Sequence, residues 1–170
     1  MKSNLVLIGY RGTGKSTIAR RLGARMERAV ISLDEEIVRS AGLNIPSIVE
    51  KFGWNHFRDL ESEEARKASS LTNRIIDAGG GVVLRPANVD ALKNSGFCVL
   101  LTASVETIAS RIASDANRPS LTGKNITDEI VSVLKEREEL YRAAADVVIS
   151  TDDKTIEEAV NGAERFYLGS

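Results

Sequence analysis

The sequence of 170 residues has few cysteines, prolines and aromatic residues: one cysteine, three prolines and 5% aromatic side chains. The single cysteine, Cys98, excludes a disulfide framework or a thiolate metal site within the chain. It lies in the apolar stretch Phe97–Leu101, so we expect its thiol to be packed in the core. With 42% hydrophobic residues the chain can build such a core.

A strong charge of either sign is also missing, because 23 Lys and Arg residues face 24 Asp and Glu residues, for a formal net charge of -1. This balance gives no general attraction to nucleic acid or anionic lipid, so a bound phosphate needs a local site. The apolar run Leu5–Ile8 is too short for a signal peptide or a membrane span. We expect a cytoplasmic monomer, one domain over residues 1–170, that binds neither nucleic acid nor membrane.

Short runs rich in Val and Ile alternate with longer helical patterns along the whole chain. Strands that are apolar on both faces and alternate with helices are typical of a parallel sheet covered on each side, which predicts the α/β class. The expected strands are 5–8, 29–33, 74–78, 97–101 and 146–150. The expected helices are 14–26, 33–41, 56–71, 86–94, 104–115, 128–144 and 155–167.

Two stretches fit no regular layer of such a sheet. Residues 43–54 form a short amphipathic insert, which with the helices beside it predicts a flap over about residues 33–61. Residues 114–125 are polar and contain Asn117-Arg118-Pro119, as expected of a loop between two helices. Because loops of this kind often close over active sites, we expect a lid over about residues 112–125.

The strongest signal follows the first strand, where Gly9-Tyr10-Arg11-Gly12-Thr13-Gly14-Lys15-Ser16 matches the pattern G-x-x-x-x-G-K-[ST] and leads into a helix. Glycines let the backbone curl around a phosphate and direct N–H groups at it, beside the positive end of the helix. Lys15 adds a full charge and a catalytic role at the β- and γ-phosphates, and the Ser16 hydroxyl suits Mg²⁺. The predicted ligand is therefore ATP with Mg²⁺, held by Gly12, Thr13, Gly14, Lys15, Ser16 and Thr17.

A P-loop alone is compatible with GTPases, motor ATPases and small-molecule kinases. The chain has no Asn-Lys-x-Asp guanine motif, and its balanced charge argues against a helicase-type motor. Five further features follow in order: Ser32-Leu33-Asp34, Phe57-Arg58-Asp59-Leu60-Glu61, Gly79-Gly80-Gly81, Arg118-Pro119, and Arg137 before Leu140-Tyr141. With these motifs in this order and spacing, the sequence resembles the shikimate kinases along nearly its whole length.

The resemblance implies a nucleoside monophosphate kinase-like fold, with a five-stranded parallel sheet flanked by helices, a substrate-binding flap and a lid. It implies a phosphotransferase that converts ATP and shikimate to ADP and shikimate 3-phosphate, in aromatic amino acid biosynthesis. ATP and shikimate would then be the partners, and Mg²⁺ the cofactor.

Candidate residues for the acceptor side agree with this chemistry. Asp34 ends the second strand at the carboxyl edge of the sheet, where it could accept hydrogen bonds from hydroxyls and take the transferred proton. An acid in a first helical turn is also favoured by the helix dipole alone. Arg58 and Arg137 are the expected carboxylate ligands, because a guanidinium matches a planar carboxylate. Glu61, three residues after Arg58, is placed to hold it.

Further binding residues are expected around these groups. The glycines Gly79–Gly81 end a strand and let backbone approach the substrate, with the Gly80 N–H as donor. The resemblance implies that Arg118 swings over the triphosphate as a catalytic group. Arg111 is expected to stack on the adenine, with the turn 151–153 against the adenine edge.

The sequence departs from the family pattern at the second strand. The family usually has an acid two positions before the substrate-binding Asp, where this chain has Ser32. Ser32 and Glu35 form a capping-box pattern instead. Asp77 stands where the family is usually uncharged, and we hypothesise that it restores negative charge near Mg²⁺. Trp54 is expected to anchor the flap and His56 to lie on a helix surface.

Two alternatives to a shikimate kinase remain open at this point. A kinase for another small hydroxy acid, such as gluconate or quinate, would also use a carboxylate site built from two arginines. The missing acid at Ser32 leaves room for a nucleotide-dependent sensor that kept the fold and lost turnover.

Overall fold

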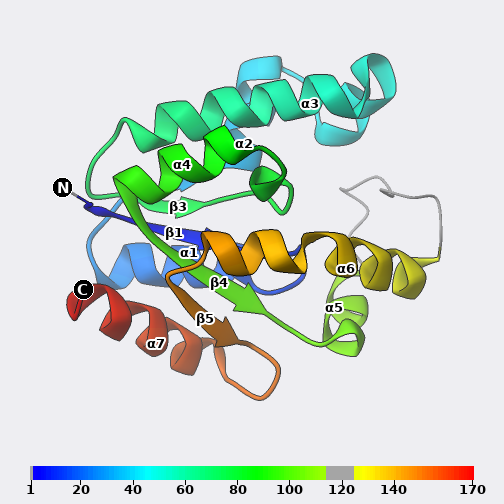
Figure 1. Ribbon diagram of the computed structural model, residues 1–170. Helices are drawn as coiled ribbons and strands as arrows, with labels where there is room; N and C mark the ends of the chain where they lie inside the picture. The colour runs from blue at the N-terminus through cyan, green and yellow to red at the C-terminus, as the bar shows by residue number, and fades with distance from the viewer. Residues whose placement is uncertain (1, 114–124) are drawn as a thin grey trace.

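The computed structural model describes residues 2–113 and 125–170, so Arg118 and most of the predicted lid lie outside the described residues. Five parallel strands form one sheet in the order β2-β3-β1-β4-β5 (Figure 1). The strands are β1 (Asn4–Ile8), β2 (Val30–Ser32), β3 (Ile75–Asp77), β4 (Gly96–Thr102) and β5 (Val147–Ser150). The predicted α/β class and the parallel sheet are therefore confirmed.

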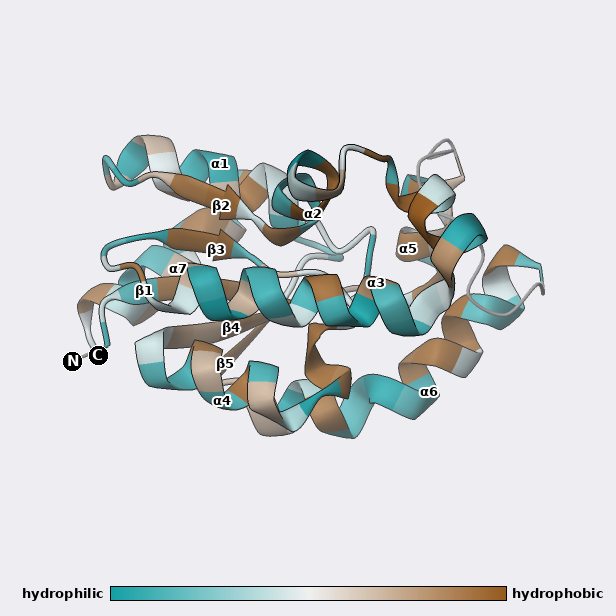
Figure 2. Ribbon diagram, turned by 90° about the horizontal axis from the view of Figure 1, so that it is seen from above, coloured by the Kyte–Doolittle hydropathy of each residue, from teal (hydrophilic) through white to brown (hydrophobic). Residues whose placement is uncertain are grey.

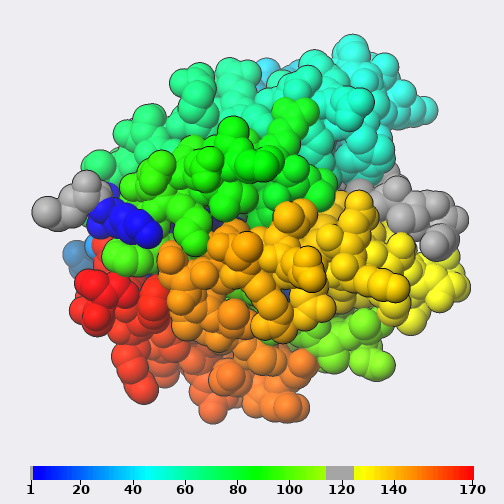
Figure 3. Space-filling view, viewed as in Figure 1, coloured from blue at the N-terminus to red at the C-terminus, as the bar shows by residue number. Residues whose placement is uncertain are grey.

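Helices cover both faces of the sheet, because parallel strands that are apolar on both sides must be buried on both sides. The helices are α1 (Lys15–Arg25), α2 (Leu33–Ala41), α3 (Ile45–Ser69), α4 (Pro86–Ser95), α5 (Val105–Ile112), α6 (Ile126–Ala144) and α7 (Ile156–Leu168), with a 3-10 turn η1 (Val82–Leu84). Helices α1 and α7 pack on one face, whereas α3, α4 and α6 pack on the other. Figure 3 shows α3, α4 and α6 together on the surface of that second face.

The core follows from the apolar residues of the central strands, which point alternately to the two faces. Val6 and Ile8 pack with Cys98 towards α3, α4 and α6, while Leu5 and Leu7 pack towards α1 and α7. Cys98 is 1% exposed, and burial raises the pKa of its thiol to about 12. Its predicted place in the core is confirmed. Figure 2 shows the apolar strands enclosed by helices with polar outer sides.

The insert predicted outside the regular layers is itself helical and continues into α3. Asn44 caps its start by accepting a hydrogen bond from the Ser47 N–H at 2.9 Å. Gly53 interrupts the helix with φ of 82° and ψ of 169°, a conformation open mainly to glycine. The expected helix over residues 56–71 therefore begins earlier, at Ile45, because the kink at Gly53 interrupts the 3.6-residue spacing of apolar residues by which helices are predicted.

A small separate core holds this insert. Ile45 and Ile48 pack there with Ile37 of α2 and Phe57 of α3. Trp54 packs against the same cluster, edge-on to the Phe57 ring, which confirms its anchoring role. His56 is exposed and contacts the Phe52 ring, as expected for a helix surface. The insert therefore sits firmly at the α2–α3 corner.

The two ends of the described chain lie side by side, where the Tyr167 hydroxyl donates to the Ser3 carbonyl at 2.9 Å (Figure 1). Among residues 2–113 and 125–170, none of the helices has the length and apolar character needed to cross a lipid bilayer.

Candidate active site

The P-loop leaves β1 at the carboxyl edge of the sheet and leads into α1. Gly9, Gly12 and Gly14 have φ values of 138°, 79° and 94°, which L-residues with side chains rarely adopt. A Cβ at Gly9 would also overlap with the Leu101 carbonyl oxygen of β4. The glycine spacing is therefore required by the shape of the loop itself, before any phosphate binds.

Lys15 and Thr13 hold the loop in this shape. Lys15 Nζ donates to the carbonyl oxygens of Gly9 and Tyr10 at 2.8 and 2.9 Å, and its side chain is largely buried. Thr13 Oγ1 donates to the Tyr10 carbonyl at 2.7 Å. The lysine ammonium thus lies inside the loop, at the position from which it can reach the end of a triphosphate.

A cavity of about 380 Å³ opens in front of the loop. It is lined by Arg11, Gly12, Gly14, Lys15, Ser16, Thr17, Asp34, Asp77, Gly80 and Arg111. Residues from both predicted halves of the site, nucleotide and acceptor, therefore share one cavity. This contiguity is what a direct transfer between two bound substrates requires.

Ser16 and Asp77 are in direct contact within this cavity. The Ser16 hydroxyl donates to Asp77 Oδ2 at 2.6 Å, and Asp77 is 6% exposed. Burial raises the pKa of the Asp77 carboxyl, against the lowering effect of Lys15 and of the Ser16 hydrogen bond. Ser32 caps α2 by accepting the Glu35 N–H at 3.4 Å, which confirms its predicted capping role.

Arg58 is fixed by the acid that the sequence assigned to it. Its Nη1 donates to Glu61 Oε2 at 2.7 Å, and the Glu61 side chain is 1% exposed. Burial raises the pKa of Glu61, and the Arg58 guanidinium acts in the opposite direction. The Arg58 guanidinium also lies over the Trp54 and Phe57 rings, 5.5 and 5.2 Å from their centroids. The predicted Arg58–Glu61 pair is confirmed.

The glycine turn after β3 connects this region to α6. A Cβ at Gly79 would lie 2.7 Å from Glu61 Oε1 and 3.2 Å from Asp34 Oδ1, so Asp34 and Glu61 both border the turn. The Gly80 carbonyl accepts hydrogen bonds from Arg137 Nη1, at 3.2 Å, and from the Tyr141 hydroxyl. The predicted donor role of the Gly80 N–H stays a prediction.

Arg111 lies at the nucleotide end of the site. Its guanidinium donates to the Gly12 carbonyl and to Thr151 Oγ1 at 3.0 Å each. A second cavity, of about 180 Å³, is lined by Gly14, Thr17, Arg111, Thr151, Lys154, Ile156 and their neighbours Thr13, Ile18, Thr155 and Ala159. Its place beside the P-loop and Thr151 suits an adenine. Asp152 is engaged elsewhere, accepting the Ser104 N–H at 2.7 Å.

The sequence reasoning assigned no role to Arg11, Glu129 or Tyr141 at the site. Arg11 Nη2 pairs with Glu129 Oε1 at 2.7 Å, and Glu129 is almost fully buried at the start of α6. This pair joins residues 118 positions apart, so no local motif could reveal it. Burial raises the pKa of the Tyr141 hydroxyl to about 12, which keeps it a hydrogen-bond donor to Gly80.

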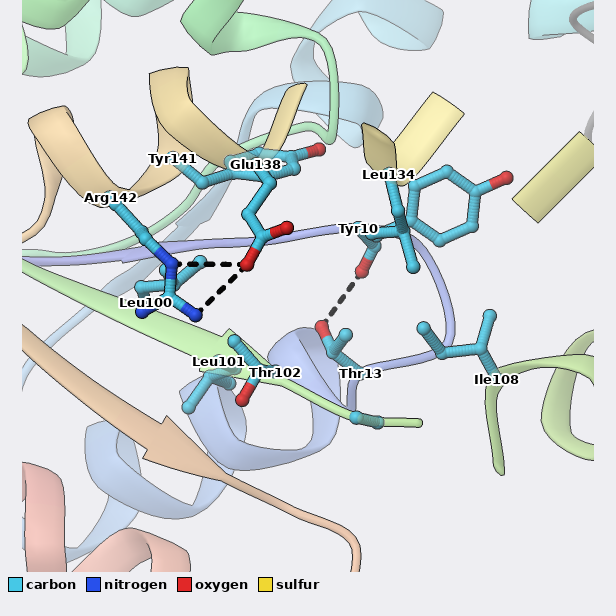
Figure 4. Close-up of a pocket in the computed structure, with 11 residues that line it drawn as sticks. Tyr10, Thr13, Leu100, Leu101, Thr102, Ile108, Leu134, Glu138, Tyr141 and Arg142 are labelled. Atoms are coloured by element: carbon cyan, nitrogen blue, oxygen red, sulfur yellow. Dashed lines mark hydrogen bonds and ion pairs between the residues drawn. The ribbon is translucent and has the colours of Figure 1, made fainter. Parts of the chain in front are cut away.

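Behind the P-loop lies a third cavity, of about 250 Å³, between β4, α5 and α6 (Figure 4). Figure 4 shows the Thr13–Tyr10 hydrogen bond on one side of it and the Glu138–Arg142 ion pair on the other. Its lining is mainly apolar, with Leu100, Leu101 and Ile108. The cavity contains none of the sequence-predicted acceptor residues.

The donor set of the main cavity fits a magnesium ion that arrives with a nucleotide. In the described part of the chain, no cluster of three or more His, Cys, Asp or Glu could hold a metal ion alone. A hydroxyl hydrogen-bonded to a buried carboxylate, as in Ser16 and Asp77, offers the oxygen ligands that Mg²⁺ prefers. Phosphate oxygens and waters would complete the coordination.

Comparison with known proteins gives one consistent result. The family model described as shikimate kinase matches residues 11–166. The shikimate kinase of Caldanaerobacter subterraneus subsp. tengcongensis is 39% identical over 165 residues, covering 97% of this chain and 96% of the relative. The shikimate kinase of Acinetobacter baumannii, solved in complex with shikimate, is 31% identical with a TM-score of 0.94, covering 99% and 94% of the two chains. That of Aquifex aeolicus is 31% identical with a TM-score of 0.83, covering 98% and 96%. The chain belongs to the shikimate kinase family.

Proposed function

We propose that the chain transfers the γ-phosphoryl group of Mg²⁺-bound ATP to a hydroxyl of shikimate, giving ADP and shikimate 3-phosphate. The observation that carries this proposal is the shared cavity, in which the P-loop faces Asp34 and the Gly80 turn. The Acinetobacter baumannii relative, solved with shikimate bound, supports shikimate as the acceptor.

Arg58 and Arg137 hold the carboxylate of the acceptor. Arg58 is preset by its bond to Glu61, so little side-chain entropy is lost when the substrate binds. Arg137 is 7% exposed, and its Nη1 donates a hydrogen bond to the Gly80 carbonyl. Its buried Nε has no hydrogen-bond partner in the described part of the chain. A buried donor of this kind is costly unless a ligand satisfies it.

Asp34 orients the hydroxyl that is phosphorylated and takes its proton. Its carboxylate borders both the cavity and Gly79, which places it beside the glycine turn assigned to the acceptor. Phosphoryl transfer through a loose transition state needs little covalent help, so positioning supplies most of the rate. The close backbone of Gly79–Gly81 lets the ring of the acid approach this carboxylate.

The P-loop and the cations around it neutralise the phosphates. The N–H groups at the start of α1 and the Lys15 ammonium hold the β- and γ-phosphates. Mg²⁺, when bound, supplies positive charge between the phosphate oxygens, and Ser16 is the protein ligand that we assign to it. Arg111 borders the adenine, and we assign the neutralisation of charge on the transferred group to Arg118, which lies outside the described residues.

An ADP-release assay tests this function directly. With purified protein, ATP and Mg²⁺, release of ADP is expected to depend on shikimate and to produce one ADP per shikimate consumed. Gluconate and quinate, tested in the same way, measure the selectivity for the acid. ATP binding without acid-stimulated ADP release would contradict the proposal and favour a nucleotide sensor.

We further propose that the chain acts in the cytoplasm and as a monomer, since the P-loop, Asp34 and Gly80 line one cavity without residues of a second copy. Light scattering coupled to size-exclusion chromatography tests the first part. A mass near 18.4 kDa is expected, with and without ATP and shikimate.

A further inference from the structure

Asp77 is an unusual residue for its position in the fold. It ends β3, directly beside Leu7 of β1 and Ser32 of β2 in the parallel register. Residues paired in this way point to the same face, and here the face is the one covered by α1. Leu5 and Leu7 of β1 and Ile75 of β3, on that face, are apolar and fully buried.

A carboxylate placed in such surroundings needs a specific reason, since burial of a charged group is costly unless it is paired. Its carboxylate accepts a hydrogen bond from the Ser16 hydroxyl at 2.6 Å, and Lys15 is close enough to act on its charge. Both residues belong to the P-loop. Asp77 therefore directs its charge at the end of the loop where the terminal phosphates and their cation would lie.

The neighbouring strand offers no such charge. Ser32, in register with Asp77, is a neutral residue whose hydroxyl is used to cap α2. In P-loop proteins generally, Mg²⁺ is held by the P-loop hydroxyl together with an acid from a strand beside the loop. In this chain, the described strand residues next to Ser16 provide that acid at position 77.

We propose that Asp77 is a positioning residue for Mg²⁺. Its carboxylate orients the Ser16 hydroxyl and would place a negative charge beside the cation, at the end of β3, as an acid at position 32 could do at the end of β2. This inference rests on the proposed function for the identity of the nucleotide complex. It concerns nucleotide binding only, so it can be tested without shikimate.

The test is the affinity for ADP measured by calorimetry, with Mg²⁺ and with EDTA, together with binding of Mn²⁺ to the ADP complex by electron paramagnetic resonance. The variants are Asp77→Asn, which keeps an oxygen acceptor for Ser16 but removes the charge, and Asp77→Asn with Ser32→Asp. An aspartate at position 32 can still cap α2. Asp90→Asn, which removes an exposed charge on α4, is the matched control.

Asp77→Asn is expected to weaken metal binding in the ADP complex by about 10- to 100-fold, with ADP affinity in EDTA little changed. Ser32→Asp in the same chain is expected to restore most of the loss. Asp90→Asn should behave like the wild type. Unchanged metal binding in Asp77→Asn overturns the proposal, and so does a loss that Ser32→Asp fails to restore, because position rather than charge would then matter.

Circular dichroism shows whether Asp77→Asn is folded. If this single variant does not fold, the double variant with Ser32→Asp tests the proposal instead. If the double variant folds and binds Mn²⁺ like the wild type, the charge role is supported. If it folds without the metal-dependent gain in ADP affinity, the role is refuted. A protein that shows this metal dependence yet phosphorylates no shikimate would refute the proposed function alone.

Discussion

The guanidinium of Arg58 lies against the Cα of Gly81, so a Cβ added to Gly81 would overlap with Arg58 Nη1 and Cζ. The atoms in the way belong to the far end of a flexible side chain. A substitution at Gly81 can therefore be accommodated, but only if Arg58 leaves its place. The two residues thus couple the glycine turn after β3 to the acid-binding arginine of α3.

Gly81→Ala is accordingly expected to impair substrate binding more than folding. Its φ of -96° suits alanine, so the backbone is not strained. The Michaelis constant for shikimate should rise at least tenfold while that for ATP stays nearly constant, and the melting temperature should fall by only a few degrees. Steady-state kinetics and calorimetry on the same preparation check this. A large loss of stability with an unchanged shikimate constant would contradict the placement of Arg58.

Arg58→Ala should weaken shikimate binding by ~2 to 4 kcal/mol, because a charged hydrogen-bond pair with the carboxylate is lost. ATP affinity should remain nearly intact, since Arg58 does not line the P-loop cavity. Lys15→Met should instead weaken ATP binding, leave shikimate affinity nearly intact and abolish phosphoryl transfer. Titration calorimetry with each ligand separates the two sites, and equal losses for both ligands in Arg58→Ala would refute the division into two sites.

Glu61 gives a prediction for the pH dependence of stability. Its pKa is raised by burial above the ordinary 4.5, so the folded protein binds this proton more tightly than the unfolded chain. The tighter proton binding by Glu61 in the folded state adds to the free energy of unfolding. This added stability is fully present below pH 4.5 and is lost as pH rises through the pKa of Glu61 in the folded protein. Glu61→Gln removes this loss. The difference in unfolding free energy between Glu61→Gln and the wild type, from urea titrations, should therefore shift in favour of the variant as pH rises from 4.5. A constant difference would contradict it.

Cys98 is expected to be inert in the native state. With a pKa near 12 instead of 9, the thiolate fraction at pH 8 falls about a thousandfold, and burial adds a steric barrier. Labelling by a thiol reagent should follow global unfolding as urea is added. Rapid stoichiometric labelling without denaturant would show that the β4 core opens locally.

Local sequence motifs predicted most of the candidate site residues, because the geometry of these residues is set by neighbours close in the sequence. The P-loop glycines, the Ser32 cap and the Arg58–Glu61 pair each depend on a few successive residues. The pairing of Ser16 with Asp77, by contrast, exists because the sheet order places β3 between β2 and β1. From the sequence we could predict a negative charge near Mg²⁺ at Asp77, but not the hydrogen bond that Ser16 donates to this carboxylate.

Two further features were beyond the reach of sequence patterns. The pair Arg11–Glu129 depends on how the start of α6 folds back over the P-loop. The helix before Gly53 was expected as an irregular insert, since the kink at that glycine shifts the period of apolar residues. In both cases tertiary packing decided the outcome.

The proposed function requires ATP to bind against the P-loop and shikimate to bind against Arg58, Arg137 and Asp34, with Asp34 lining the same cavity as the P-loop. A crystal structure with shikimate and a non-hydrolysable ATP analogue measures the relevant distances. We expect the shikimate carboxylate to lie between the two arginines, and one hydroxyl oxygen to lie on Asp34, about 3 to 3.5 Å from the γ-phosphorus. Shikimate bound away from Asp34, or with its carboxylate on neither arginine, would contradict it.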